Sequence, residues 1–203
     1  MIAIVDYGVG NLFSLKSSFA RIGAEAVVTG DASLLLAADR VILPGVGAFG
    51  DAMDKLRDSG LAGTVRQVAA NGVPLLGICL GMQLLFERSY EFGVHEGLGL
   101  IPGEVQPLRP VLPDTLKVPQ IGWNALHLLK PDSPLLANTH EGDHVYFVHS
   151  YHAVGCGDAL IASAEYGVPV TAAVQRNNVF GTQFHPEKSG AVGLNMLRAF
   201  CAL

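Results

Sequence analysis

The residues with the clearest capacity for chemistry surround a single cysteine. Cys79 lies within residues 77–81, Gly-Ile-Cys-Leu-Gly, directly after the apolar residues 74–76. This pattern is typical of a nucleophile elbow, a tight turn between a strand and a helix that presents a reactive side chain, here a thiol instead of a serine hydroxyl. The dipole at the start of the helix stabilises a thiolate. The same five residues are equally consistent with a small cysteine packed at the end of a buried strand.

A thiol nucleophile also needs a group that removes its proton and later protonates the leaving group, and histidine suits both tasks near neutral pH. His185 follows an apolar stretch and precedes Pro186, which ends a strand. Glu187 is near enough to accept the imidazole N–H and to fix the tautomer. Working groups in open α/β sheets gather at the carboxyl ends of strands, so we expect Cys79 and His185 to meet there.

The elements that must position these residues alternate between strands and helices in the first half of the chain. Apolar runs at residues 3–5, 26–28, 41–43 and 74–78 predict buried strands, and helical patterns follow Asn11 and span residues 59–71. This alternation is typical of an α/β, doubly wound, mostly parallel sheet.

The sequence pattern of the second half is different, because its apolar segments are shorter and are interrupted by prolines. Residues 101–108, 118–123 and 124–129 predict antiparallel strands added to the sheet edge. Residues 170–174 and 179–184 flank an Asn-Asn pair that tolerates positive φ, which predicts a hairpin. A final helix is expected after Ser189.

Composition narrows the class of protein. The 203 residues are 50% apolar and 15% charged, which predicts a single domain over residues 1–203. The net charge of −5 and the lack of a basic run argue against nucleic acid or an anionic membrane as a partner. Three cysteines without framework spacing favour a reducing compartment, and we expect a cytoplasmic protein without a signal peptide. No apolar run reaches the ~20 residues that span a bilayer.

The elbow with Gln83 four residues after Cys79, and the later His-Pro-Glu of residues 185–187, resemble the class I glutamine amidotransferases over nearly the whole chain. Within that class, residues 6–11, 44–47, 119–124 and 185–189 are similar to the glutaminase subunits of imidazole glycerol phosphate synthases. The resemblance implies a flavodoxin-like fold and a Cys79, His185 and Glu187 triad that needs no cofactor or metal. It also implies hydrolysis of L-glutamine to glutamate and ammonia, with ammonia passed to a cyclase subunit in a heterodimer of histidine biosynthesis.

Attack on an amide carbonyl creates an oxyanion that needs N–H donors in fixed positions. The amide of Leu80 follows the nucleophile directly, and we expect the second donor to be Val46 N–H, because its flanking glycines let the peptide rotate. Gln83 lies one helical turn after Cys79 and is expected to bind the substrate. The resemblance adds Gly47, Ser150 and Tyr151 as substrate contacts. Taken alone, residues 44–47 are also consistent with a plain turn, and Gln83 with a solvated helix position.

Ammonia released into neutral water is protonated and is no longer a nucleophile, so the site should open toward a partner. The resemblance places Asn11, Gln120, Trp123 and Lys188 on the docking surface. The alternative for Trp123 is a core position. We hypothesise that the isolated chain is a poor glutaminase because the Val46 peptide turns inward only when the partner and its ligand are bound.

Several other patterns lead to alternative hypotheses. Residues 140–144 fit the HExxH pattern of zinc hydrolases, but their glycine and aspartate and the strand pattern that follows favour a turn. Gly8 and Gly10 lack the third glycine of a dinucleotide fingerprint. His149 and His152 are interpreted as structural or interface residues. A glutaminase subunit of another amidotransferase complex would keep the triad and change the partner, whereas a non-catalytic module would lack the base or the acid.

Overall fold

The computed structural model describes all residues from Met1 to Leu203. Its main sheet has nine strands in the order β2-β1-β3-β4-β13-β12-β11-β8-β9. The strands from β2 to β13 in this order are parallel, and the rest are antiparallel. Their bounds are β1 (Ile2–Val5), β2 (Ala26–Thr29), β3 (Arg40–Leu43), β4 (Leu75–Ile78), β8 (Gln120–Leu128), β9 (His144–His149), β11 (Leu160–Glu165), β12 (Pro169–Arg176) and β13 (Val179–Thr182).

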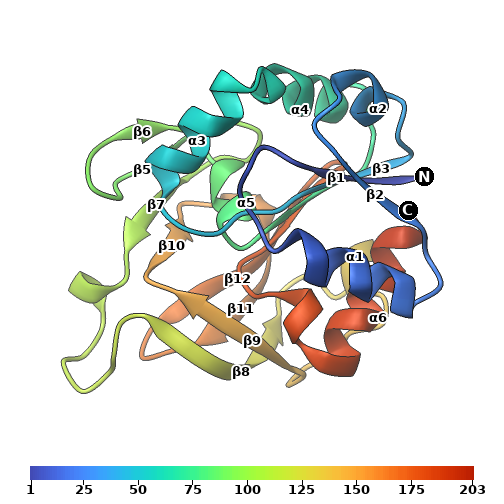
Figure 1. Ribbon diagram of the computed structural model, residues 1–203. Helices are drawn as coiled ribbons and strands as arrows, with labels where there is room; N and C mark the ends of the chain where they lie inside the picture. The colour runs from blue at the N-terminus through green and yellow to red at the C-terminus, as the bar shows by residue number, and fades with distance from the viewer.

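A smaller sheet with the order β10-β7-β5-β6 lies beside the main sheet (Figure 1). It consists of short strands: β5 (Arg88–Ser89), β6 (His95–Glu96), β7 (Glu104–Pro107) and β10 (Tyr151–Val154). Because β10 follows β9 after a single residue, the chain passes directly from the main sheet to the small one at Ser150.

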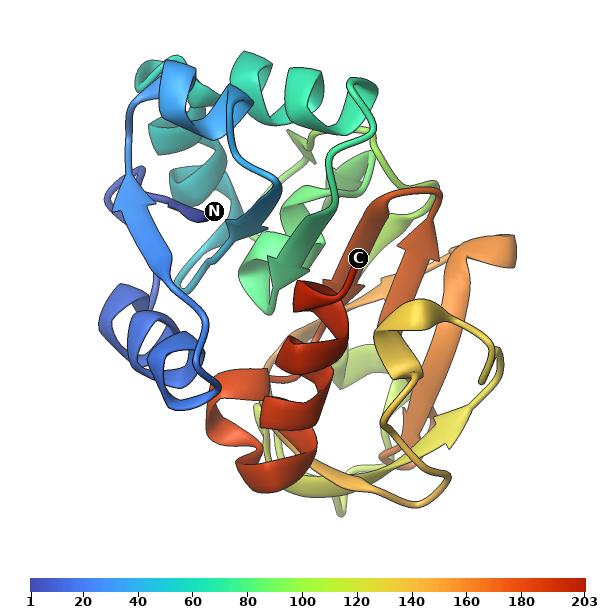
Figure 2. The ribbon, with the colours of Figure 1, turned by 90° about the vertical axis from the view of Figure 1, so that its right-hand side faces the viewer.

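Helices cover both faces of the main sheet. The helices α2 (Ala32–Leu36), α3 (Phe49–Asp58) and α4 (Leu61–Ala70) lie on one face, and α1 (Leu12–Arg21) and α6 (Gly190–Cys201) lie side by side on the other (Figures 1 and 2). Each face buries its own apolar cluster, of 30 and 24 residues. The remaining helical segments are short: α5 (Leu80–Leu84), η1 (Arg109–Val111), η2 (Pro134–Leu136), η3 (Gly157–Ala159) and η4 (Pro186–Lys188).

This architecture confirms the doubly wound α/β sheet with antiparallel edge strands, and it corrects several details. The predicted strand at residues 101–108 does not join the edge of the main sheet, because β7 belongs to the smaller sheet. Residues 118–129 were expected to form two segments, but β8 is one continuous strand from Gln120 to Leu128. The hairpin is confirmed, with Asn177 at φ 54°, although β13 ends at Thr182. Helix α4 matches the pattern at residues 59–71, whereas α3 has no sequence prediction. The helices are too short or too polar for any of them to traverse a lipid bilayer.

Candidate active site

Cys79 occupies the tight turn that its glycine-rich surroundings predict. It follows β4 and immediately precedes α5, with φ 55° and ψ −112°, a conformation that is rare for a residue with a side chain. A Cβ at Gly77 would lie 2.6 Å from the carbonyl oxygen of Gly81, and a Cβ at Gly81 would collide with the carbonyl oxygen of Leu43. Both glycines are therefore required by close backbone contact, and the nucleophile elbow replaces the interpretation of a plain packed cysteine.

His185 and Glu187 form the relay behind this thiol. Nδ1 of His185 donates to Oε1 of Glu187 at 2.8 Å, and both side chains are almost completely buried. Pro186 opens the η4 turn directly after His185 and brings the carboxylate back toward the ring. With Nδ1–H held by Glu187, the tautomer presents Nε2 to the thiol.

The charge on this imidazole is strongly favoured by its neighbours. Burial opposes the charged form, but the hydrogen bonds and charges of Cys79 and Glu187 outweigh burial and raise the pKa of His185 to about 9. The imidazole beside the Cys79 thiol is thus charged at neutral pH, and a cationic partner of this kind activates a cysteine nucleophile.

The raised pKa predicts a contribution of His185 to stability that depends on pH. Because the folded-state pKa of about 9 lies above the ordinary 6.5, the contribution is complete below pH 6.5 and disappears as the pH rises to about 9. The shift corresponds to about 3 kcal/mol. Urea unfolding of the protein and of His185→Gln, measured across this pH range, should show the difference in unfolding free energy shrinking by that amount. A difference that does not change with pH contradicts the assignment.

A network of two glutamines lies beside the thiol. Nε2 of Gln183 donates to Sγ of Cys79 at 3.8 Å, and Oε1 of Gln183 accepts a hydrogen bond from Nε2 of Gln83 at 2.9 Å. Gln83 also donates to the carbonyl oxygen of Tyr151 at 3.0 Å. These bonds fix the Gln83 amide at the wall of the cleft, so it is not a solvated helix residue. Sequence reasoning missed Gln183, whose only signal is a polar side chain within the apolar stretch 179–184, directly after β13.

The two predicted oxyanion donors belong to segments that pack against each other, and both N–H groups are free. Neither Leu80 N–H nor Val46 N–H donates to another group of the protein. A Cβ at Gly45 would lie 2.5 Å from the Gly81 nitrogen, so the turn at residues 44–47 packs directly on the first turn of α5. The hydroxyl of Tyr7 donates to the Pro44 carbonyl oxygen at 2.7 Å and anchors this turn from below. Val46 itself is 43% exposed.

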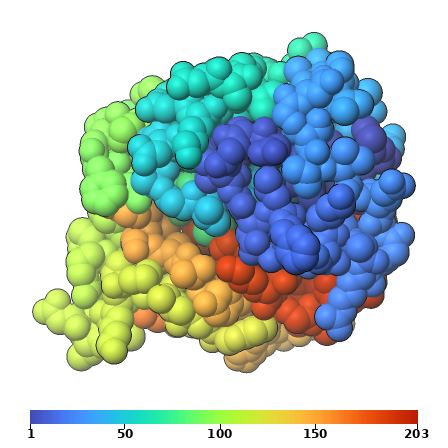
Figure 3. Space-filling model, viewed as in Figure 1, coloured from blue at the N-terminus to red at the C-terminus, as the bar shows by residue number.

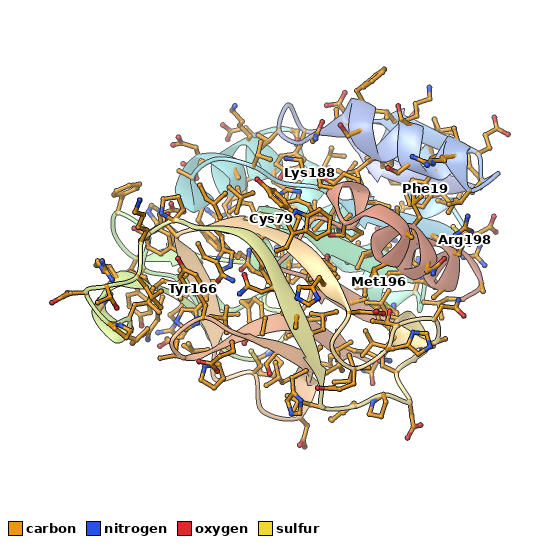
Figure 4. All side chains as sticks on the ribbon, turned by 90° about the horizontal axis from the view of Figure 1, so that it is seen from below. Phe19, Cys79, Tyr166, Lys188, Met196 and Arg198 are labelled. Carbon is orange, nitrogen blue, oxygen red and sulfur yellow. The ribbon has the colours of Figure 1, made fainter.

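A cleft of about 370 Å³ brings the predicted residues together. Segments that are far apart in the sequence meet on this face, as the cyan, orange and red parts of the space-filling view show (Figure 3). Every predicted catalytic, oxyanion and substrate residue lines the cleft except Glu187, which lies behind His185, and the other lining residues are Lys188, Glu91, Pro119, Val148 and His149. Seen from below, the labelled Cys79 and Lys188 lie at the same edge of the sheet (Figure 4).

Glu91 brings a carboxylate to the cleft that sequence reasoning missed. Its Oε2 accepts a hydrogen bond from Phe49 N–H at 2.7 Å, in the first turn of α3. Partial burial raises the pKa of Glu91, and the bond from Phe49 opposes this shift. The residue lies in the short connection between β5 and β6, which carries no motif, so only the folded chain shows that it points toward the cleft.

The predicted docking residues differ in exposure. Trp123 is 54% exposed and packs edge-on against Tyr146, with 6.0 Å between ring centroids, so it is not a core residue. Lys188 lies 6.0 Å above the same Tyr146 ring. Asn11 is partly exposed, whereas the side chain of Gln120 is completely buried and does not contribute to the exposed surface.

The alternative zinc site is wrong. His140 lies in a turn whose backbone N–H donates to Asp143 Oδ2 at 2.8 Å, and His144 is the first residue of β9. The two histidines therefore do not face one side of a helix, which zinc ligation by this motif requires.

Comparison with known proteins agrees with this geometry. The family model of glutamine amidotransferase class-I matches residues 3–202. The imidazole glycerol phosphate synthase subunit HisH of Wolinella succinogenes is 49% identical over 205 residues, which cover 100% of both chains. The protein of the same name from Geobacillus thermodenitrificans is 52% identical over 206 residues, covering 100% of this chain and 96% of the relative.

Solved structures share the fold at much lower identity. The structure of PurLQS from Thermotoga maritima has a TM-score of 0.76 at 20% identity and covers 99% of this chain and 97% of that chain. A crystal structure of a glutamine amidotransferase has a TM-score of 0.75 at 19% identity and covers 99% of this chain and all of that one. Together with the elbow, the buried His–Glu relay and the family match over almost every residue, these findings show that the chain belongs to the class-I glutamine amidotransferases.

Proposed function

We propose that this chain, acting as one domain over residues 1–203, is the glutaminase subunit of an imidazole glycerol phosphate synthase. It hydrolyses L-glutamine and delivers ammonia to a cyclase subunit, which makes imidazole glycerol phosphate and AICAR in cytoplasmic histidine biosynthesis. The observation that carries the proposal is the Cys79–His185–Glu187 relay at the cleft. The full-length relatives that are about half identical and named as this subunit support the choice of partner.

The reaction follows from the positions of the chain's own groups. The Cys79 thiolate attacks the side-chain amide carbon of glutamine, and the N–H groups of Leu80 and Val46 stabilise the oxyanion. The tetrahedral intermediate collapses to a glutamyl thioester as His185 gives its proton to the departing nitrogen, which leaves as ammonia. Water, deprotonated by His185, then hydrolyses the thioester to glutamate and regenerates the thiolate.

The cleft also offers groups that match the two ends of the substrate. Glu91 is the cleft carboxylate outside the triad, and we assign it to the α-ammonium group of glutamine. The backbone of Gly47, Ser150 and Tyr151 and the Oε1 atom of Gln83 supply the remaining polar contacts.

Replacing Glu91 by glutamine tests this assignment. We expect Glu91→Gln to raise KM for glutamine by about ten- to a hundredfold, the loss of one charge-assisted hydrogen bond, with a much smaller change in kcat. Glu96→Gln, which changes an exposed carboxylate on neighbouring β6, serves as the control and should keep the wild-type KM. An unchanged KM in Glu91→Gln would show that another group binds the ammonium.

The oxyanion turn supports dependence on the partner. Tyr7 holds Pro44, and Gly45 packs on α5, but Val46 and Gly47 are exposed and make no backbone hydrogen bond. We infer that docking of the cyclase with its ribonucleotide ligand orders the Val46 peptide for catalysis.

The experiment that tests the proposed function compares glutamate release by the isolated chain with release by its complex with the cyclase and ligand. We expect slow hydrolysis alone and stimulation of at least about a hundredfold in the complex, which is the effect of one oxyanion donor. Equal rates would contradict the coupling. Assembly with a different synthase would assign the chain to another amidotransferase complex.

A further inference from the structure

Two buried hydrogen-bond acceptors beside the cleft have no partner in the protein. Oε1 of Gln120 and Nε2 of His149 belong to side chains that are more than nine-tenths buried, and no donor reaches either atom. Buried polar atoms normally have partners because an unpaired atom loses its interaction with water without compensation. A pair of such atoms near a reaction centre therefore points to a ligand.

The two residues are neighbours in the sheet. Gln120 on β8 is paired with His149 on β9 in the antiparallel register, and both side chains are on the buried face. Residues opposite each other on one face have Cβ atoms about 5 Å apart. His149 lines the cleft with Cys79, and the carbonyl oxygen of its neighbour Val148 lies 4.0 Å from the Cys79 sulfur.

The protein fixes the Gln120 amide with its oxygen unpaired. Nδ2 of Asn124 donates to the backbone carbonyl oxygen of Glu165 at 3.1 Å, so Asn124 turns its Oδ1 toward Gln120. That oxygen accepts from Nε2 of Gln120 at 3.0 Å. The free atom of Gln120 is consequently Oε1, which only accepts hydrogen bonds.

A hydrogen bond also fixes the tautomer of His149 and leaves one ring nitrogen as an unpaired acceptor. Its Nδ1–H donates to the carbonyl oxygen of Tyr151 at 2.9 Å, which leaves Nε2 as the unprotonated nitrogen. Burial lowers the pKa of His149 to about 4, so the ring is neutral at neutral pH. At neutral pH both atoms only accept hydrogen bonds, so a ligand that satisfies them must carry N–H or O–H groups.

We propose that Gln120 Oε1 and His149 Nε2 form a transit site that binds ammonia after it leaves the thioester at Cys79. The inference rests on the proposed function, in which ammonia forms in this cleft and leaves toward the partner. Ammonia carries three N–H donors, and neither the amide oxygen nor the neutral imidazole can protonate it. His149 lines the cleft in which ammonia forms, and Gln120 lies opposite it on β8, so the pair borders the reaction centre.

The test measures how much of the released ammonia reaches the cyclase. In the two-subunit complex with saturating glutamine, moles of cyclised product are measured per mole of glutamate. Gln120→Met keeps the length of the side chain and removes the acceptor oxygen. We expect this ratio to fall about two- to tenfold, the effect of losing one hydrogen bond, with the remaining ammonia found in the medium. Thr139→Val removes another buried unpaired oxygen, in the loop after η2, and should keep the wild-type ratio.

The outcomes separate the transit site from other roles. A wild-type ratio of product to glutamate in Gln120→Met overturns the proposal. That result would mean that the two acceptors bind only water or, if KM for glutamine rises, that they bind the substrate. If Gln120→Met does not assemble, the half-buried Asn124→Ala frees the Gln120 amide to rotate and should lower the ratio to a smaller extent; an unchanged ratio there also overturns the proposal. Failure of the proposed function is a different result, because the unaltered complex would then release no glutamate.

Discussion

Cys79→Ala is expected to lower glutamine-dependent product formation by the complex about 10⁴-fold or more, as loss of a covalent nucleophile does in other enzymes. The thiol sits at a strained turn with φ 55°, beside an imidazole whose pKa is raised to about 9. No other cysteine shares these features, since Cys156 is buried beside Thr171 and Cys201 lies in α6. The change therefore removes the group that forms the thioester.

Two controls define this result. Product formation driven by added ammonium salt should remain at the wild-type rate, because the cyclase then needs no glutaminase. Cys156→Ala removes a second buried thiol outside the cleft and should leave glutamine-dependent activity intact. Glutamine-dependent activity that survives in Cys79→Ala would exclude the proposed mechanism.

Glu187→Gln is expected to have the second largest effect, a fall in kcat of about 10³- to 10⁴-fold. Oε1 of Glu187 accepts from Nδ1 of His185 at 2.8 Å and stabilises the imidazolium. A neutral amide removes that charge and can hold the wrong tautomer. The pKa of His185 should fall, so the pH profile of kcat should also change, which a purely structural role would not produce.

The surface of the chain offers a matched control for this prediction. His127 Nδ1 and Glu141 Oε1 are also 2.8 Å apart, but both side chains are exposed and neither residue lines the cleft. Glu141→Gln should keep the wild-type kcat and pH profile. Wild-type kcat in Glu187→Gln would show that the carboxylate does not assist His185.

The parts of the site that could be predicted from the sequence are those fixed by short-range geometry. The glycines around Cys79 are needed because the backbones of Gly77, Gly81 and Leu43 touch. Pro186 forces a turn that returns Glu187 to His185 within two residues. Such constraints act between residues that are close in the sequence, so they can be recognised as short sequence motifs.

The residues that could not be predicted depend on contacts between distant segments. Glu91 reaches the cleft because its carboxylate accepts from Phe49, 42 residues earlier. Gln183 matters through Gln83, 100 residues away. Gln120 is the first residue of β8, and Ile121 and Trp123 of the same strand are exposed. Because side chains alternate along a strand, Gln120 points to the buried face, opposite His149. The motif at residues 119–124 contains both Gln120 and Trp123, and the motif alone does not show which of the two side chains is buried and which is exposed.

The most direct measurement of the central claim is the detection of the covalent intermediate. The complex is quenched in acid during steady-state turnover of glutamine and is then digested with a protease. The masses of the peptides are measured by mass spectrometry. The account predicts one glutamyl group on the peptide that contains Cys79, and no adduct in Cys79→Ala. Continued release of glutamate with no glutamyl group on Cys79 at any quench time, or with the group on another residue, would contradict it.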